Sequence, residues 1–514
     1  MLFDGLRSRI YMLRCLLRAF PNRRIRIHQP VPFVWGTYAI GFSEQDTIWS
    51  QLLSLPGWGR EIVFVDLTPN THIQSYPQKS IKGFIQSVTR NSILLTTLRR
   101  TLARGKMDVA WEAICPGNNA VALVLGGGIN WLNTLSLFRA KGWRIIFAEE
   151  AFFGEGSRDF ANLLHRNEID FAEFDSKTNP HASYDQISFY PILRERFHWI
   201  LTNGPRQFHS SVKAYAKIQK RYNVKLMLRS ESPTGLGHTI EASARNAGCK
   251  VIQWQHGMVT HHREVTEFMD SSQGMCSDYM FVYGDAVKRE ILEYRNYDEP
   301  QVVSIGSAAM DNLALTGRPH AASHVILYAT TGYYKENWYF GYSPPLSDIH
   351  LYRDQKMFVN LLRQQVTVGQ KAILKLHPGM TSEDSENLLK SEEANNIRIV
   401  RGENTFSELL AESDVVVLDF PSTTLLQSIR SGLPVFVLMR HLRYPPEARR
   451  LLEQRAVCSE SAAELSNRVQ EFLKTGDYPA DLKDDQFIKA YGTHLNDGQS
   501  AQRAVDFAIQ ATTP

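Results

Sequence analysis

The chain has 514 residues, of which 43% are hydrophobic and 21% are charged, and its formal net charge is +4. The length suits about two to four domains, the composition is that of a globular protein, and so small a charge argues against nucleic acid as a partner. Five cysteines lie far apart without a CxxC or Cys/His cluster, and no apolar run is long enough to span a bilayer. The sequence therefore predicts neither a disulfide framework nor a zinc site, and it favours a reducing cytoplasm.

The first predicted element is a basic amphipathic helix over residues 1–24. Its apolar residues recur at spacings of three and four from Phe3 to Phe20, which draws one seam along a helix. Arginines surround this seam, and such helices lie on anionic membrane surfaces. This interpretation places the protein in the cytoplasm, peripherally on the inner face of the cell membrane. The alternative is a helix that packs on the body of the protein or on a partner.

From about residue 60 onward, short apolar runs alternate with amphipathic helices. Apolar runs without polar alternation, separated by helices, are typical of parallel sheets covered on both faces. The expected strands form two series, 61–66, 120–125, 143–148, 198–202, 224–230, 250–254, 279–283 and 301–305, then 324–329, 371–376, 397–401, 415–419 and 434–438. The prediction is an α/β fold in which two doubly wound Rossmann-like domains, 25–315 and 320–490, face each other across a cleft. A last helix within 491–514 is expected to return to the first domain.

Ligands of open α/β sheets bind at the carboxyl ends of strands, and two strand ends of the second series carry suggestive residues. The run that ends at Asp419 is followed by Ser422 and Thr423 at the start of a helix, where unpaired N–H groups favour an anion. Another strand ends in Lys375 and His377, and the following proline directs the histidine off the sheet edge. Together these groups suit a phosphate or diphosphate. The alternatives are a plain helix cap, a turn histidine and a solvated lysine.

Two strand ends of the first series are also of interest. Strand 120–125 runs into three glycines that include Gly127 and Gly128, which would let the backbone approach a ligand, although the pattern is neither GxGxxG nor a P-loop. Strand 250–254 runs into the sequence QHG, which holds His256 and Gly257. Imidazoles thus occur at corresponding places in both halves of the chain.

The order of these motifs resembles one group of GT-B glycosyltransferases over about residues 225–440. The group contains the CDP-glycerol glycerophosphotransferases, the capsule Kdo transferases and the bacterial sialyltransferases with an HP motif. The motifs that carry the resemblance are QHG, GSAAMD, ILYATTGYY, LKLHPG and the acidic, Ser/Thr-rich loop with GLPV.

The resemblance implies a transferase with a nucleotide-activated donor, CMP- or CDP-linked, and no further cofactor. Metal independence is expected from the residues, because the lysine, the histidine and the hydroxyls could stabilise the leaving phosphate and no Asp-x-Asp pair occurs. The second domain would bind the donor, and the first would bind a glycan or glycolipid acceptor of a capsule, surface polysaccharide or lipopolysaccharide. Contacts with the donor phosphates are implied for His377, Ser422, Thr423, Thr330 and Thr331. His256 is implied at the acceptor or as the base.

The sequence departs from the group in the loop after Asp419 and in the catalytic base. The usual Asp-Tyr-Ser-Ser is here Asp-Phe-Pro-Ser-Thr, and the acidic-Gly pair of the sialyltransferases has no clean match. Transfer needs a departing phosphate whose charge is stabilised and an acceptor hydroxyl that is deprotonated. Lys375 and the phosphate-binding residues would serve the first need. His256 or a glutamate among Glu149, Glu150, Glu155 and Glu231 would serve the second. Gly127, Gly128, Gly257 and Asp419 would contact donor or acceptor, and Asp419 is expected to order its loop rather than bind a metal.

Two other functions stay open at this point. One is a nucleotide-sugar epimerase or hydrolase on the same two-domain scaffold, which would turn over donor without acceptor. The other is a non-catalytic partner in polysaccharide assembly, which would keep the fold but bind no nucleotide.

Overall fold

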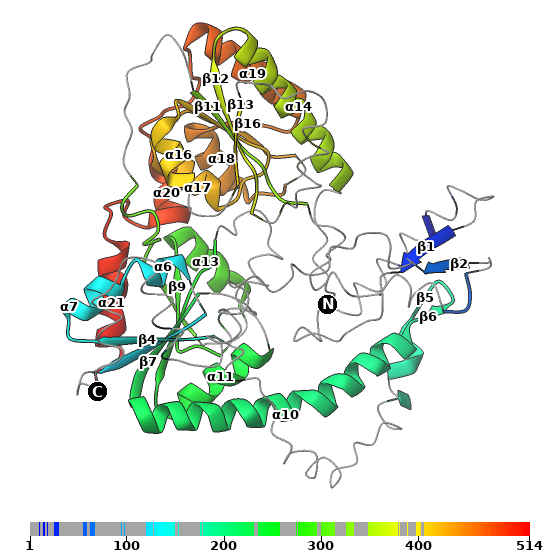
Figure 1. Ribbon diagram of the computed structural model, residues 1–514, viewed down its shortest axis with the longest axis vertical. Helices are drawn as coiled ribbons and strands as arrows, with labels where there is room; N and C mark the ends of the chain where they lie inside the picture. Colours follow the sequence, from blue (N-terminus) through cyan, green and yellow to red (C-terminus); the bar gives the residue numbers. More distant parts are fainter. Residues whose placement is uncertain are drawn as a thin grey trace.

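A computed structural model gives the fold of the chain (Figure 1). The residues that it describes are 120–149 except 127, 178–230, 235–257, 276–295, 300–313, 325–333, 348–380 except 379, 397–401 and 406–513 except 441, with short stretches elsewhere that include 25–29, 55–58 and 62–66. Most of the predicted helix over 1–24 lies outside these residues.

The first large sheet has six parallel strands in the order β10-β9-β8-β7-β3-β4 (Figure 1). Its strands are β3 (Val121–Leu125), β4 (Arg144–Ala148), β7 (Val224–Arg229), β8 (Lys250–Trp254), β9 (Tyr279–Val282) and β10 (Gln301–Ser304). Every residue of β3 and β4 is buried. Their runs lack alternating polar residues because helices cover both faces of the sheet.

The second large sheet is also six-stranded and parallel, in the order β13-β12-β11-β14-β15-β16. Its strands are β11 (Val325–Ala329), β12 (Lys371–Lys375), β13 (Ile397–Val400), β14 (Val415–Leu418), β15 (Val435–Leu438) and β16 (Val457–Ser459). The order reverses between β11 and β14, and in the first sheet it reverses between β3 and β7. Such switch points are where doubly wound sheets open a crevice for ligands.

Helices connect these strands and cover the sheets (Figure 1). In the first half they are α6 (Ile129–Leu132), α7 (Leu135–Ala140), α10 (Tyr190–Tyr222), α11 (Gly235–Asn246) and α13 (Asp285–Tyr294). In the second half they are α14 (Asp348–Thr367), α16 (Phe406–Glu412), α17 (Thr423–Arg430), α18 (Pro446–Arg455), α19 (Ala462–Thr475), α20 (Gln486–Ile488) and α21 (Ser500–Gln510). The predicted fold class, an α/β fold with two doubly wound Rossmann-like domains, is confirmed.

Two of the expected strands are corrected by the structure. The run 198–202 lies inside the long helix α10, because a short apolar run fits a buried strand and one side of a helix equally well. The run 61–66 does form a strand, β2 (Ile62–Asp66), but it pairs with β1 (Ile25–Gln29) in a separate two-stranded sheet. A short hairpin of β5 (Ser183–Tyr184) and β6 (Ile187–Ser188) precedes α10.

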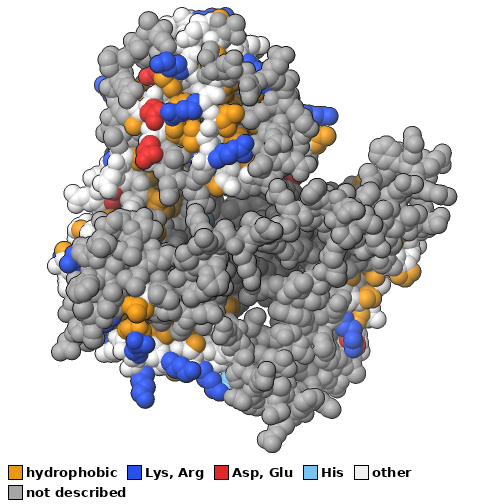
Figure 2. Space-filling view, in the orientation of Figure 1, with side chains coloured by type: hydrophobic (Ala, Val, Ile, Leu, Met, Phe, Trp, Pro, Cys, Tyr) orange, Lys and Arg blue, Asp and Glu red, His pale blue; other side chains and the backbone are white. Residues whose placement is uncertain are grey.

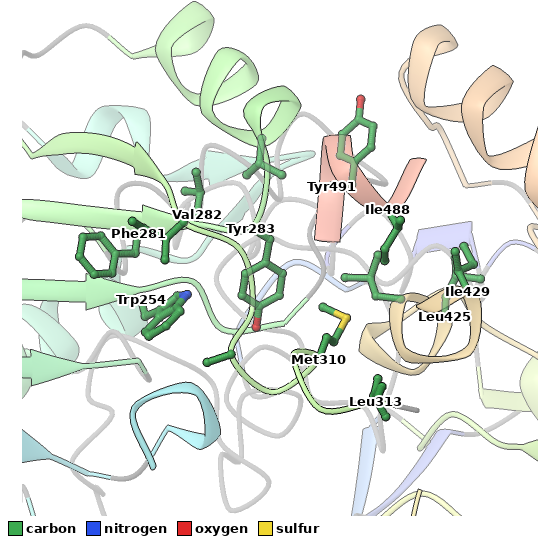
Figure 3. Packing of buried hydrophobic residues seen from close by; sticks show 14 of the residues in the cluster. Trp254, Phe281, Val282, Tyr283, Met310, Leu313, Leu425, Ile429, Ile488 and Tyr491 are labelled. Carbon is green, nitrogen blue, oxygen red and sulfur yellow. The ribbon is translucent and has the colours of Figure 1, made fainter. Parts of the chain in front are cut away.

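The two domains share one hydrophobic core cluster (Figure 3). Side chains at the end of β9 lie near those of α17, with Met310 and the segment after α20 between them. That segment, a π-helical turn over Lys489–Thr493, packs so closely on Gly284 that a Cβ there would collide with the Ala490 carbonyl. Burial of apolar side chains from both domains stabilises their relative placement.

The end of the chain returns to the first sheet. The ring of Phe507 in α21 lies edge-on to Tyr279 and Phe281 at centroid distances of 5.1 and 5.4 Å. Asp311, the last residue of the GSAAMD motif, accepts hydrogen bonds from the Ser500 and Ala501 N–H groups at 3.0 and 2.7 Å. A carboxylate stabilises the positive end of a helix, so this motif residue anchors the returning helix.

The described part of the N-terminal segment lies against the body of the protein. Ile10 is buried, and the Arg14 guanidinium pairs with the Asp185 carboxylate at 2.7 Å while it stacks over Trp58.

The last turns of α10 carry exposed basic residues. Figure 2 shows Lys and Arg side chains along the lower edge of the view, where these turns lie in Figure 1. The exposed basic residues of those turns are Lys213, Lys217, Lys220 and Arg221. Among the described helices, none has the length and apolarity that a membrane crossing requires.

Candidate functional site

The switch point of the second sheet is bridged by Asp419, which directly follows β14. Its Oδ1 accepts the N–H of Thr331, which lies after β11, at 2.7 Å. Its Oδ2 accepts from the Gln355 amide and the Tyr328 hydroxyl, each at 3.0 Å. The side chain is only 2% exposed, and burial raises the pKa of Asp419 to about 7 although these three hydrogen bonds lower it. Both oxygens are engaged within the fold, so Asp419 orders the loop after β11.

A second contact joins the loop after β11 to the end of β12. The His377 N–H donates to the Thr330 hydroxyl at 3.0 Å. The His377 ring is exposed and lies over the backbone of Gly332, where a Cβ would come within 2.6 Å of Nδ1. A side chain at position 332 would therefore displace the imidazole. The structure brings His377, Thr330 and Thr331 to one edge of the sheet.

The residues 419–424, here called the hydroxyl loop, lead into α17. Ser422 occupies the N-cap position, but its side chain makes no capping hydrogen bond. Its hydroxyl instead lies 2.9 Å from the Thr424 hydroxyl, and Thr423 is the first residue of the helix. The simple helix-cap alternative for Ser422 is thus wrong. The loop thus places three hydroxyls at the positive end of the helix dipole, which suits an anion.

In the first domain, the QHG motif at the end of β8 is held by buried polar side chains. Gln255 accepts the Tyr283 N–H at 2.9 Å and donates to the Gly257 carbonyl at 2.8 Å. The Tyr283 hydroxyl lies 3.3 Å from the Gly257 N–H and accepts a hydrogen bond from the Asn130 amide at 3.1 Å. His256, between these fixed residues, is exposed.

The two motifs meet across the domains. Gly257 has a φ of +73°, and a Cβ built on it would lie 2.8 Å from the Thr423 Oγ1. Only glycine accommodates both this backbone conformation and this close approach. The QHG motif of the first domain and the hydroxyl loop of the second therefore border one site.

A family model described as LIC12162 family transferase matches residues 182–470, which is more than half of the chain. The chain belongs to this transferase family. The match runs from β5 into α19 and includes the QHG motif, His377 and the hydroxyl loop. No curated protein matches the chain.

Solved structures of similar architecture include three that cover almost their whole length. A UDP-GlcNAc 2-epimerase from Neisseria meningitidis has 12% identity and a TM-score of 0.46, over 76% of this chain and 100% of that one. A glycosyltransferase from Rickettsia africae has 14% identity and a TM-score of 0.43, over 77% and 99%. MurG from Acinetobacter baumannii has 10% identity and a TM-score of 0.39, over 76% and 99%. At this level of similarity, the three structures say nothing about the ligand or the reaction of this member of the LIC12162 family.

Of the remaining predicted site residues, the structure describes Lys375 and Gly128. Lys375 is 5% exposed and its Nζ donates to the Leu376 carbonyl at 3.1 Å, so it is not a solvated edge charge. Gly128 packs against Ser230 at the switch point of the first sheet, where a Cβ would collide with the serine hydroxyl. Glu150, Glu231 and Gly127 lie outside the described residues.

Sequence reasoning missed four residues that position the site, namely Gln355, Tyr283, Asn130 and Gly332. Gln355 lies in the middle of α14, and its amide also donates to the Thr331 carbonyl at 3.0 Å. Asn130 accepts from Ser307 Oγ and the Ala309 N–H, each at 3.0 Å. Glycine after a strand, as at position 332, is a recognisable signal for a close approach. A buried glutamine inside a helix carries no such signal in a single sequence.

Proposed function

We propose that the chain is a glycosyltransferase, or polyol-phosphate transferase, that uses a nucleotide-activated donor. The observation that carries the proposal is the contact between Gly257 and Thr423, because it joins an imidazole-bearing strand end of one domain to an anion-binding helix start of the other. A transferase must hold donor and acceptor together and exclude water, and a site shared by two domains suits this task.

In this proposal the second domain binds the phosphates of the donor. The hydroxyls of Ser422 and Thr423 and the first N–H groups of α17 would bind the leaving phosphate, together with the exposed His377 imidazole. Preorganised donors aimed at developing negative charge lower the barrier of such a step. The chain has no Asp-x-Asp pair to hold a donor-bridging cation, so we include metal independence in the proposal.

The first domain would supply the acceptor and the base. His256 is exposed at the border of the shared site, and its neighbours Gln255 and Gly257 are fixed by hydrogen bonds. A positioned imidazole is a suitable base for an acceptor hydroxyl. Glu150 and Glu231 remain candidate bases from the sequence.

The identity of the substrates is the finer part of the proposal. The motif resemblance supports a CMP- or CDP-linked donor and a glycan or glycolipid acceptor of a bacterial capsule, surface polysaccharide or lipopolysaccharide. The basic residues of segment 1–24 and the exposed basic turns of α10 support a place on the inner face of the cell membrane. Clustered basic groups of this kind attract anionic lipids.

A panel of CMP-, CDP-, UDP- and GDP-linked donors, scored by thermal shift and then by turnover, tests the proposal. A donor that binds the folded state raises the melting temperature by mass action. Donor turnover that needs an acceptor supports the transferase, whereas turnover without one supports an epimerase or hydrolase. The absence of a shift with every donor would favour a non-catalytic partner.

His377→Ala tests the assigned phosphate contact. We expect donor turnover to fall by about a hundredfold or more, the size seen when one charge-stabilising donor is removed, while the melting temperature stays unchanged. His181→Ala is the matched control, because His181 is an exposed histidine of the short 3₁₀ turn over Asn179–His181. Full activity in the His377 variant would contradict the assignment.

A further inference from the structure

A separate polar cluster lies at the start of α11 and is not used by the proposed transfer reaction. His238 and Glu241 are three residues apart, so both side chains project from one side of the helix. Their Nδ1 and Oε2 atoms lie 3.1 Å apart. Glu241 is 1% exposed, and its other oxygen, Oε1, lies 3.2 Å from the Nε of the equally buried Arg229. Arg229 thus neutralises one oxygen of the carboxylate and leaves the other directed at His238.

Cys276 completes the cluster from another part of the chain. It lies near the end of the connection from β8 to β9, a connection that begins with the QHG motif. One ligand atom from each of His238, Glu241 and Cys276 lies within 4.8 Å of the other two. The sequence predicted no zinc site because no Cys/His cluster is visible along the chain, but folding brings these three residues together.

The three atoms that converge in this cluster are of the types that bind transition metals. An imidazole nitrogen, a thiolate sulfur and a carboxylate oxygen are the three ligand types that zinc takes in proteins. The separation of 3.1 Å between Nδ1 and Oε2 suits two ligands of one ion, since each bond to zinc is about 2.0–2.2 Å long. Three protein ligands would leave one coordination position open.

The three side chains could also be held together without a metal. In that case they form an ion-pair cluster with Arg229, and this is the competing explanation of the geometry.

We propose that His238, Glu241 and Cys276 bind one Zn²⁺ ion. The ion would tie the end of the β8–β9 connection to the first turns of α11 within the first domain. The set shares no residue with the hydroxyl loop, His256 or His377, so the inference does not depend on the proposed function. Arg229, whose guanidinium leaves no room for a Cβ at Gly237, would orient the carboxylate from outside the ligand set.

Metal content of the full chain tests this proposal directly. Protein purified without chelator and saturated with zinc should retain about one zinc ion per chain after gel filtration, as mass spectrometry of the metal would show. Replacement by Co²⁺ should add a thiolate-to-cobalt charge-transfer absorption. Cys276→Ser and His238→Gln should lose both signals. Cys15→Ser is the matched control, because Cys15 is exposed and outside the cluster.

A second measurement uses the unmodified chain and so does not depend on how the variants fold. Zinc should slow alkylation of Cys276 by N-ethylmaleimide by about tenfold or more, since only the free thiolate reacts, and should leave Cys15 unaffected. Zinc retention that is unchanged in Cys276→Ser, or alkylation of Cys276 that is insensitive to zinc, would overturn the proposal and leave the ion-pair cluster as the explanation.

Discussion

The contact between Gly257 and Thr423 predicts a specific effect of Gly257→Ala. Alanine in the left-handed region costs about 1–2 kcal/mol of folding free energy, which applies at a φ of +73°. The added Cβ would also lie 2.8 Å from Thr423 Oγ1, so Thr423 or the facing domain must move by about 0.6 Å to restore the 3.4 Å of an ordinary contact. Displacement on this scale at a reacting site costs about tenfold to a hundredfold in rate.

Gly248→Ala is the matched control for this variant. Gly248 lies in the turn before β8 with a φ of +78°, but a Cβ there meets no atom within 4 Å. Both variants should therefore melt a few degrees lower than the parent chain, by similar amounts. Only Gly257→Ala should lose kcat/KM toward the nucleotide-activated donor that the thermal-shift panel selects. Equal activity of the two variants would refute a shared site between the QHG motif and the hydroxyl loop.

Between pH 4 and 7 the folded chain keeps the proton on Asp419, whereas the unfolded chain loses it. The free energy of unfolding should therefore fall as pH rises through this range, by up to about 4 kcal/mol, and should level off above pH 7. Asp419→Asn should flatten this slope in denaturant titrations at a series of pH values, and an unchanged slope would assign it to other groups. Ser422→Ala should weaken donor binding but cost under about 0.5 kcal/mol of stability, because the Ser422 side chain makes no capping hydrogen bond. Ser461→Ala removes a side-chain cap, so it should cost about 1 kcal/mol of stability and leave donor binding intact. Deletion of residues 1–24 should move the protein from the membrane to the soluble fraction, and an unchanged distribution would leave only the packing role that Arg14 shows.

The sequence predicted the elements of the core well because their signals are local. Continuous apolar runs bounded by polar turns identified the strands of both large sheets except β16, and the positions of the runs fixed which residues stand at the carboxyl ends. The run 198–202 failed because its five residues carry no period that separates a strand from a helix. Strand 62–66 was found, but its partner was not, since pairing is a long-range property.

The candidate site shows the same division. Ser422, Thr423 and His377 were visible because each follows a strong strand signal. The ordering role of Asp419 was expected from the sequence, but its partners Gln355 and Tyr328 come from other elements and only the structure identifies them. Asp311 is part of a recognisable motif, but its use as an anchor for α21 depends on a helix that lies near the other end of the chain.

The sequence by itself determined the α/β class, the two series of strands and the residues that lie at the carboxyl ends of those strands. It could do so because burial and turn chemistry act on neighbouring residues. Tertiary structure alone decided which edges meet. The contact of Gly257 with Thr423 and the cluster of His238, Glu241 and Cys276 both join residues that are distant along the chain. Such contacts depend on strand order and domain placement, which arise from packing of the whole core and leave no local pattern in the residues that they bring together.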